Sequence, residues 1–286
     1  MREKLINEEA LLTVLRHLKR KDILSEVVII GGSVLYLYRA HFADSDIPPY
    51  ATKDLDLLLP EARNDLPQID LPAILAECGF IGDASYTYTH PDIDIDILTP
   101  RHERCRGSRT FLKGYNTFAL AEVHLDLLRD HTQSIRYGGL LVTVPRIEAF
   151  TCHRFLIAPE RVDEPDRDKD HAVAVALADI VLSKKTLCDA FCHIAESRDR
   201  SSREALYRTL FRHKPALYGV LSLFCLGRFI DAEKVEKGPE RKALQVAEKV
   251  IRLEGLLAYH NPIYREVRNG LEPKMIAAFA QEHKNR

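Results

Sequence analysis

The sequence has no long hydrophobic run, and its longest, around residues 27–30, has only the length of a β-strand. A membrane-spanning helix needs roughly 18 consecutive apolar residues, so we expect no membrane partner. The N-terminal segment is amphipathic and lacks the apolar core of a signal peptide. Cysteine is sparse and shows no disulfide framework. These absences predict a cytoplasmic protein with reduced thiols at positions 78, 105, 152, 188, 192 and 225.

A strong charge of one sign is also missing, because the formal net charge is only -1. The chain as a whole therefore has no attraction to nucleic acid or to an anionic membrane, and any such binding requires a local patch. A hydrophobic content of 46% with 29% charged residues is typical of a globular protein and excludes a disordered one. The length of 286 residues is sufficient for two domains.

The hydrophobic pattern changes near Arg146. Before this residue, strands alternate with helices, and after it every segment has a helical pattern. Strands are predicted at 26–30, 53–59, 84–90, 93–98 and 140–144, helices at 4–20, 34–40, 71–79 and 119–130, and irregular chain at 101–115. Later helices are predicted at 146–157, 168–183, 186–197, 202–228, 239–258 and 272–283. We therefore expect an α+β fold, with a small mixed sheet flanked by helices in a domain at 1–145 and a helical domain at 146–286.

Two aspartates interrupt the apolar strand at 53–59. Side chains alternate along a strand, so Asp54 and Asp56 point to one face and Leu55 and Leu57 to the other. Two neighbouring carboxylates repel each other and lose hydration when buried. A divalent cation removes both penalties, and Mg²⁺ prefers oxygen ligands of this kind. The pair therefore indicates a metal site.

The strand at 93–98 repeats the pattern, since Asp92, Asp94 and Asp96 share one face. If the two aspartate strands are neighbours, three carboxylates can hold two metal ions. Alternation along the strand does not show which of these three aspartates is the third member of such a cluster. The alternative is that these are solvent-facing positions of an edge strand, where aspartate discourages aggregation.

A glycine turn precedes both strands. Gly31, Gly32 and Ser33 lie between the predicted strand at 26–30 and the predicted helix at 34–40. Backbone N–H groups at a helix N-terminus favour phosphate, and the serine hydroxyl offers a further contact. The turn alone is weak evidence, but its order relative to the aspartates makes a nucleotide site the best interpretation.

These residues resemble the nucleotidyltransferase superfamily of the DNA polymerase β type, whose pattern is a Gly-Ser turn, Asp-x-Asp and a later acidic residue. The segments at 31–38, 51–58, 95–100 and 142–154, with Asp-Lys-Asp at 168–170, are similar to bacterial proteins related to nucleotidyltransferase toxins of the abortive-infection type. In those relatives the later acidic residue precedes a hydrophobic-Leu pair. The resemblance therefore favours Asp96, with Asp94 as the alternative ligand.

The resemblance implies Mg²⁺- or Mn²⁺-dependent transfer of a nucleoside monophosphate from an NTP to an acceptor hydroxyl. It assigns catalysis and metal binding to Asp54, Asp56 and Asp96. It assigns phosphate binding to Gly31, Gly32 and Ser33, and triphosphate contacts to Arg154 and Lys169, with Arg167 and Asp170 nearby. The helical domain would then form the other wall of the cleft. Relatives usually have lysine at the position of Arg154, and this departure supports an alternative, a weakly active or inactive protein that binds a nucleotide or a partner.

The acceptor remains open. The resemblance favours the 3′ end of tRNA or a protein side chain, possible targets of a toxin with a cognate antitoxin, over a small molecule such as an antibiotic. Two basic clusters allow RNA binding without requiring it. The clusters comprise Arg101, His102, Arg104, Arg106, Arg109 and Lys113, and Arg198, Arg200, Arg203, Arg208, Arg212 and Lys214.

Overall fold

The computed structural model describes residues 6–42, 47, 52–60, 68–82, 85–100, 108–214, 217, 218, 220 and 221. The chain divides into two compact units, Met1–His153 and Arg154–Arg286. The helices predicted at 239–258 and 272–283, and the end of the one predicted at 202–228, lie outside the described residues. No helix in the described part of the chain is both long and apolar enough to cross a membrane.

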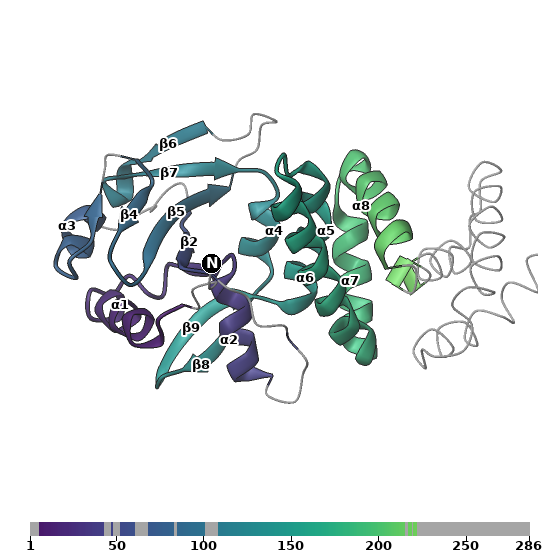
Figure 1. Ribbon diagram of the computed structural model, residues 1–286, viewed down its shortest axis with the longest axis horizontal. Coiled ribbons are helices and arrows are strands. Elements are labelled where there is room, and N and C mark those ends of the chain that lie inside the picture. The colour runs from purple at the N-terminus through teal and green to yellow at the C-terminus, as the bar shows by residue number, and fades with distance from the viewer. Residues whose placement is uncertain are drawn as a thin grey trace, which may run out of the picture. The chain divides into compact units, whose positions relative to one another are not determined.

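A mixed sheet of seven described strands forms the centre of the first unit (Figure 1). Its strands are β1 (Val28–Ile30), β2 (Asp54–Leu58), β3 (Ile81–Gly82), β4 (Thr87–Thr89), β5 (Asp94–Pro100), β6 (Ser108–Leu112) and β7 (Thr117–Glu122). The order is β1-β2-β5-β4-β3, and β7 also pairs with β5 and with β6. The β2–β5 and β5–β7 pairs are parallel, and the others are antiparallel. The aspartate strands β2 and β5 are therefore direct neighbours.

The two faces of this sheet differ in burial. On one face Leu55, Leu57, Ile95 and Ile97 are at most 1% exposed. The aspartates of β2 and β5 alternate with these residues and are half-buried or exposed. Because side chains alternate along a strand, the hydrophobic face anchors the sheet and leaves the carboxylate face accessible.

Helices and a hairpin complete the first unit. They are α1 (Glu8–Arg20), α2 (Ser33–His41), α3 (Leu71–Ala76), the 3-10 turn η1 (Lys113–Tyr115), α4 (Leu125–Asp130), β8 (Thr132–Tyr137) and β9 (Leu140–Pro145). The Asn7 side chain accepts N–H bonds from Glu9 and Ala10 and so caps α1. The buried Tyr38 hydroxyl of α2 donates to the Pro145 carbonyl at 2.5 Å, which ties α2 to the end of β9.

Two predictions for this unit were wrong, and one strand of its hairpin was missed. The helix predicted at 119–130 is strand β7 followed by the short helix α4, and the irregular segment at 101–115 contains β6 and η1. Strand β8 was not predicted at all. The sequence of β7 is rich in alanine, which favours a helix, but its residues alternate between buried and half-buried positions between β5 and β6. Tertiary pairing therefore overrides a weak local propensity.

The described part of the second unit is helical. It contains the end of α5 (Ile147–Ile157), followed by η2 (Ala158–Glu160), α6 (Glu164–Ser183), α7 (Lys185–Ser197) and α8 (Arg200–His213). The helices predicted at 146–157, 168–183 and 186–197 are confirmed, although α6 begins four residues before its predicted start. The continuous helix predicted at 202–228 is wrong, because α8 ends at His213. The predicted α+β class, with a mixed sheet and a helical C-terminal region, is confirmed.

Candidate functional site

The glycine turn lies directly against one of the aspartates. Ile30 at the end of β1 is opposite Asp56 of β2, and Gly31 follows with a φ of +70°. A Cβ atom added to Gly31 would lie 1.6 Å from Oδ2 of Asp56, a distance at which no side chain fits. Gly31 is therefore required by its backbone conformation and by the carboxylate beside it.

Helix α2 begins at Ser33, immediately after this turn. The first N–H groups of a helix have no carbonyl partner within that helix, so this end favours an anion. The Ser33 side chain is fully buried, and its hydroxyl donates to the Ile30 carbonyl at 2.9 Å. A phosphate contact by this hydroxyl would require that bond to break. The backbone of the turn is thus a better phosphate ligand than the serine side chain.

Two aspartate pairs face each other across the parallel β2–β5 ladder. Asp54 is opposite Asp94, and Asp56 is opposite Asp96. Directly opposed residues of neighbouring strands point to the same face, so all four side chains share the half-exposed face of the sheet. Asp54 is exposed at the start of β2, whereas Asp56 and Asp96 are half-buried. The ladder therefore places Asp56 beside Asp96, and both side chains are more enclosed than that of Asp54.

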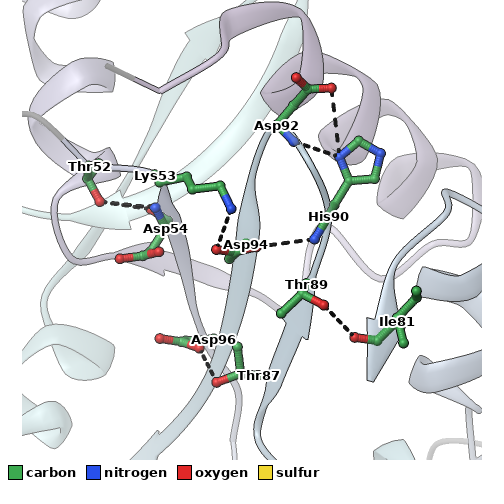
Figure 2. Close-up of polar contacts among 10 residues, drawn as sticks. All are labelled: Thr52, Lys53, Asp54, Ile81, Thr87, Thr89, His90, Asp92, Asp94 and Asp96. Carbon is green, nitrogen blue, oxygen red and sulfur yellow. Dashed lines mark hydrogen bonds and ion pairs between the residues drawn. The ribbon is translucent and has the colours of Figure 1, made fainter. Parts of the chain in front are cut away.

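Asp94 is held on both sides (Figure 2). Its Oδ2 accepts a 2.8 Å bond from the Lys53 ammonium group, and its Oδ1 accepts the backbone N–H of His90 at 3.1 Å. The two oxygens are thus engaged by a cation and a backbone donor, which together satisfy its charge.

Asp96 has a different environment. Its Oδ1 accepts a 2.6 Å bond from the Thr87 hydroxyl of β4 (Figure 2). No lysine or arginine of the described residues forms an ion pair with it. Burial raises the pKa of Asp96, the Thr87 bond opposes this, and the charge of Asp94 raises the pKa further. A half-buried carboxylate beside like charge is better stabilised by a cation than by water.

The carboxylate oxygens are suitable ligands for a divalent cation, but the described residues do not form a cluster of three ligands. Among the described residues, no group of three or more His, Cys, Asp or Glu side chains is placed to hold a metal ion. The predicted cluster of Asp54, Asp56 and Asp96 therefore stays a prediction. Mg²⁺ commonly takes one or two protein carboxylates and completes its shell with substrate phosphates and water. The facing Asp56 and Asp96 supply that smaller set beside the glycine turn.

The basic residues expected at the triphosphate belong to the second unit. Arg154 is 4% exposed and bonds to Oδ1 of the buried Asp170 at 2.5 Å. Arg161, from the end of η2, bonds to the other oxygen of Asp170 at 2.8 Å. Within its unit Arg154 therefore stabilises a buried carboxylate. Lys169 is half-buried on α6, and Arg167 pairs with Glu164.

Two residues of the sheet site were missed by the sequence analysis, Lys53 and Thr87. Lys53 directly precedes Asp54, so its position was a signal, but its partner Asp94 depends on the pairing of β2 with β5. Thr87 lies nine residues from Asp96, and no local pattern connects the two. Of the first basic cluster, Arg109 and Lys113 are described, whereas Arg101, His102, Arg104 and Arg106 lie outside the described residues.

The family is shown by comparison with known proteins. A model of a nucleotidyltransferase family matches residues 9–192, well over half of the chain, and the chain therefore belongs to this family. Among solved structures, the chain is similar to an antigenic nucleotidyltransferase-like protein from Paracoccidioides brasiliensis. The two are 15% identical, with a TM-score of 0.45, over 76% of this chain and 94% of that one. No curated protein matches the sequence. The match to the family model confirms the predicted membership of the nucleotidyltransferase superfamily.

Proposed function

We propose that the protein transfers a nucleoside monophosphate from an NTP to an acceptor hydroxyl, with Mg²⁺ or Mn²⁺ as cofactor. One observation carries the proposal. Asp56 and Asp96 face each other on parallel strands, and Asp56 lies against the Gly31 turn at the start of α2. A carboxylate pair for a cation and a helix N-terminus for phosphate are thereby adjacent, which is the combination that NTP binding requires.

Each group of the site has a distinct role. The backbone of Gly31 and Gly32 and the first turn of α2 bind the triphosphate, and Asp56 and Asp96 hold the cation, with Asp54 at the open end of the ladder. A divalent cation supplies charge stabilisation for the attacking oxygen and the leaving pyrophosphate. Asp96 accepts the proton of the acceptor hydroxyl, because a carboxylate positioned at the reacting oxygen can act as a general base.

Asp96, and not Asp94, is the third carboxylate in this proposal. Lys53 and the His90 amide occupy both oxygens of Asp94, and the partner of Asp96 is a neutral threonine. Moving a cation onto Asp94 would break an ion pair, whereas Asp96 loses only one hydroxyl bond. The register supports the same choice, since Asp96 is directly opposite Asp56.

Transfer of label from each NTP, labelled at its α-phosphate, tests the proposal. The purified chain is incubated with Mg²⁺ and with tRNA, cell protein or aminoglycoside as acceptor. Asp56→Asn and Asp96→Asn should each reduce transfer by about a hundred- to a thousand-fold, as expected when a transition-state charge loses its ligand. Asp92→Asn, an exposed control before β5, should transfer normally. Strong transfer by Asp96→Asn together with loss in Asp94→Asn would reverse the assignment.

A binding protein without catalysis is the second candidate. It is favoured by the burial of Arg154, which stands where relatives have lysine. The Arg154 guanidinium group is already bonded to Asp170. In that case NTP would bind, as measured by calorimetry, with no transfer to any acceptor. The acceptor assay also bears on a toxin-like role with a cognate antitoxin, because a tRNA or protein target is what such a role requires.

A further inference from the structure

An aromatic and basic cluster covers the outer strands of the sheet, far from the glycine turn in the strand order. The rings of Phe111 on β6 and Phe118 on β7 are 5.1 Å apart at an interplanar angle of 61°. The guanidinium carbon of Arg109 lies 4.3 Å from the centroid of the Phe118 ring. Phe111 is 50% exposed, which is unusual for a phenylalanine in a sheet. These three residues are called the β6–β7 platform below.

The strand register places this platform on the carboxylate face. Leu98 lies two residues after Asp96 on β5 and is opposite Leu120 on β7. Leu120 is in turn opposite Arg109, and Phe118 is opposite Phe111. Opposed residues, and residues two apart on one strand, point to the same side of a sheet. The platform and the Asp56–Asp96 pair are therefore on the same face of one sheet.

The surface between them is accessible. Leu98, Phe118 and Leu120 are half-buried, whereas the alternating residues Ala119 and Ala121 of β7 are buried on the opposite face. Neighbouring strands are about 4.8 Å apart, so at the Leu98 end of β5 two strand spacings, roughly 10 Å, separate β5 from β6, whereas beside Asp96 the next strand is β4. A flexible chain bound at the platform can reach the carboxylates along this face.

We infer that the β6–β7 platform binds a base of a single-stranded polynucleotide that serves as the acceptor. Aromatic side chains stack on bases of any identity, and an arginine beside them attracts the adjoining phosphate. Lys113 is exposed directly after β6 and adds positive charge, and Glu122 at the end of β7 is the one acidic residue within β6 and β7. An acidic peptide would use the charge but has no need of the two aromatic rings. This inference rests on the proposed function and names its acceptor class.

Binding of a labelled oligonucleotide tests the inference without any turnover. Fluorescence anisotropy is measured for the full chain with oligouridylate and with oligothymidylate of equal length, in the absence of NTP and divalent metal. Phe111→Ala should weaken binding about ten-fold, the loss expected for one stacked base, and Phe111→Trp should retain it. Arg109→Gln should weaken binding. It should also reduce the slope of the logarithm of the binding constant against the logarithm of the salt concentration by about one, the value for one phosphate contact.

Two matched controls lie outside the platform. Leu141→Ala removes a hydrophobic side chain on β9 that is 63% exposed, and Arg136→Gln removes an exposed arginine on β8. Both should bind like the wild type. Circular dichroism melting curves confirm that all variants fold.

Several results would overturn the inference. They are wild-type protein that binds neither oligonucleotide, Phe111→Ala that binds as tightly as Leu141→Ala, and an acidic peptide that displaces the oligonucleotide through the same residues. Preference for RNA or for DNA identifies the natural source of the strand. Label transfer without oligonucleotide binding would refute this inference alone. Oligonucleotide binding at the platform without transfer to any acceptor would refute the proposed function alone.

Discussion

Asp96 in the sheet is half-buried and Asp170 in the helical unit is buried, and the two carboxylates have opposite surroundings. Asp170 is 2% exposed and lies between the guanidinium groups of Arg154 and Arg161. Asp96 accepts a neutral hydroxyl bond and has Asp94 as its charged neighbour. A buried carboxylate with two cations stabilises the fold, because its charge is compensated internally. One without a cation is a place where an external cation can bind.

The same substitution in the two places should separate these roles, with the largest effect at Asp170. Asp170→Asn leaves the buried Arg154 without its ion-pair partner. Breaking a buried pair in this way should reduce the free energy of unfolding by about 3–5 kcal/mol. Urea unfolding followed by circular dichroism measures the change. A loss below about 1 kcal/mol would show that the arginines do not depend on this carboxylate.

Gly31→Ala is expected to have the next largest effect, because it forces a Cβ atom into the position of the Asp56 carboxylate. Gly139 provides a matched control, since its φ of +79° is similar but nothing lies within 4 Å of its added Cβ. Gly139→Ala should destabilise the protein by about 1 kcal/mol through backbone strain alone. Gly31→Ala should reach about 2–3 kcal/mol, since strain and a displaced side chain combine. Equal effects in the two variants would contradict the close contact with Asp56.

Asp96→Asn should change stability least among the substitutions. The asparagine oxygen can still accept the Thr87 hydroxyl bond, and the like-charge repulsion from Asp94 is removed. In metal-free buffer the free energy of unfolding should stay within about 1 kcal/mol of the wild type or rise. Destabilisation as large as that of Asp170→Asn would mean that Asp96 is a structural carboxylate, and the contrast between the two aspartates would fail.

The sequence predicts the parts of the site that depend on local geometry. Alternation along a strand placed Asp54 and Asp56 on one face, and the glycine turn was identified from its position between a strand and a helix. Asp94 and Asp96 share a face, so alternation does not separate them. Their difference arises from Lys53 and Thr87, which reach them only because β2, β4 and β5 are neighbours in the folded sheet. Information of this kind is absent from any local pattern.

The strands that the sequence did not predict were missed for the same reason. The alanine and leucine content of β7 favours a helix in isolation, and only pairing with β5 and β6 makes it a strand. The aromatic cluster on β6 and β7 was therefore invisible, since Phe111 and Phe118 meet across that pairing. Helices of the second unit were predicted more accurately, because their hydrophobic period is a property of each segment alone.

Mild acid should affect the helical unit through two stacked histidines. The rings of His171 on α6 and His213 on α8 are 4.0 Å apart at 18°, and Nδ1 of His171 is buried without a hydrogen-bond partner in the described residues. Burial lowers the pKa of both imidazoles. For His171, the charge of His213 lowers the pKa further, whereas the charges of Asp168 and Asp170 raise it. For His213, the charge of Arg212 lowers the pKa further, whereas the charge of Asp168 raises it.

The sign of the pH effect follows from these directions. A lowered pKa in the folded state means that the unfolded chain binds more protons below about pH 6.5, so the free energy of unfolding falls as the pH falls through this range. His213→Phe preserves ring stacking and removes one titrating group. Between neutral and mildly acidic pH its free energy of unfolding should therefore fall less steeply than that of the wild type, and the two slopes should differ by less than the effect of one proton, about 1.4 kcal/mol per pH unit. Urea unfolding at each pH measures the slopes. Parallel pH profiles would show that the stacked pair does not control the acid response of the helical unit.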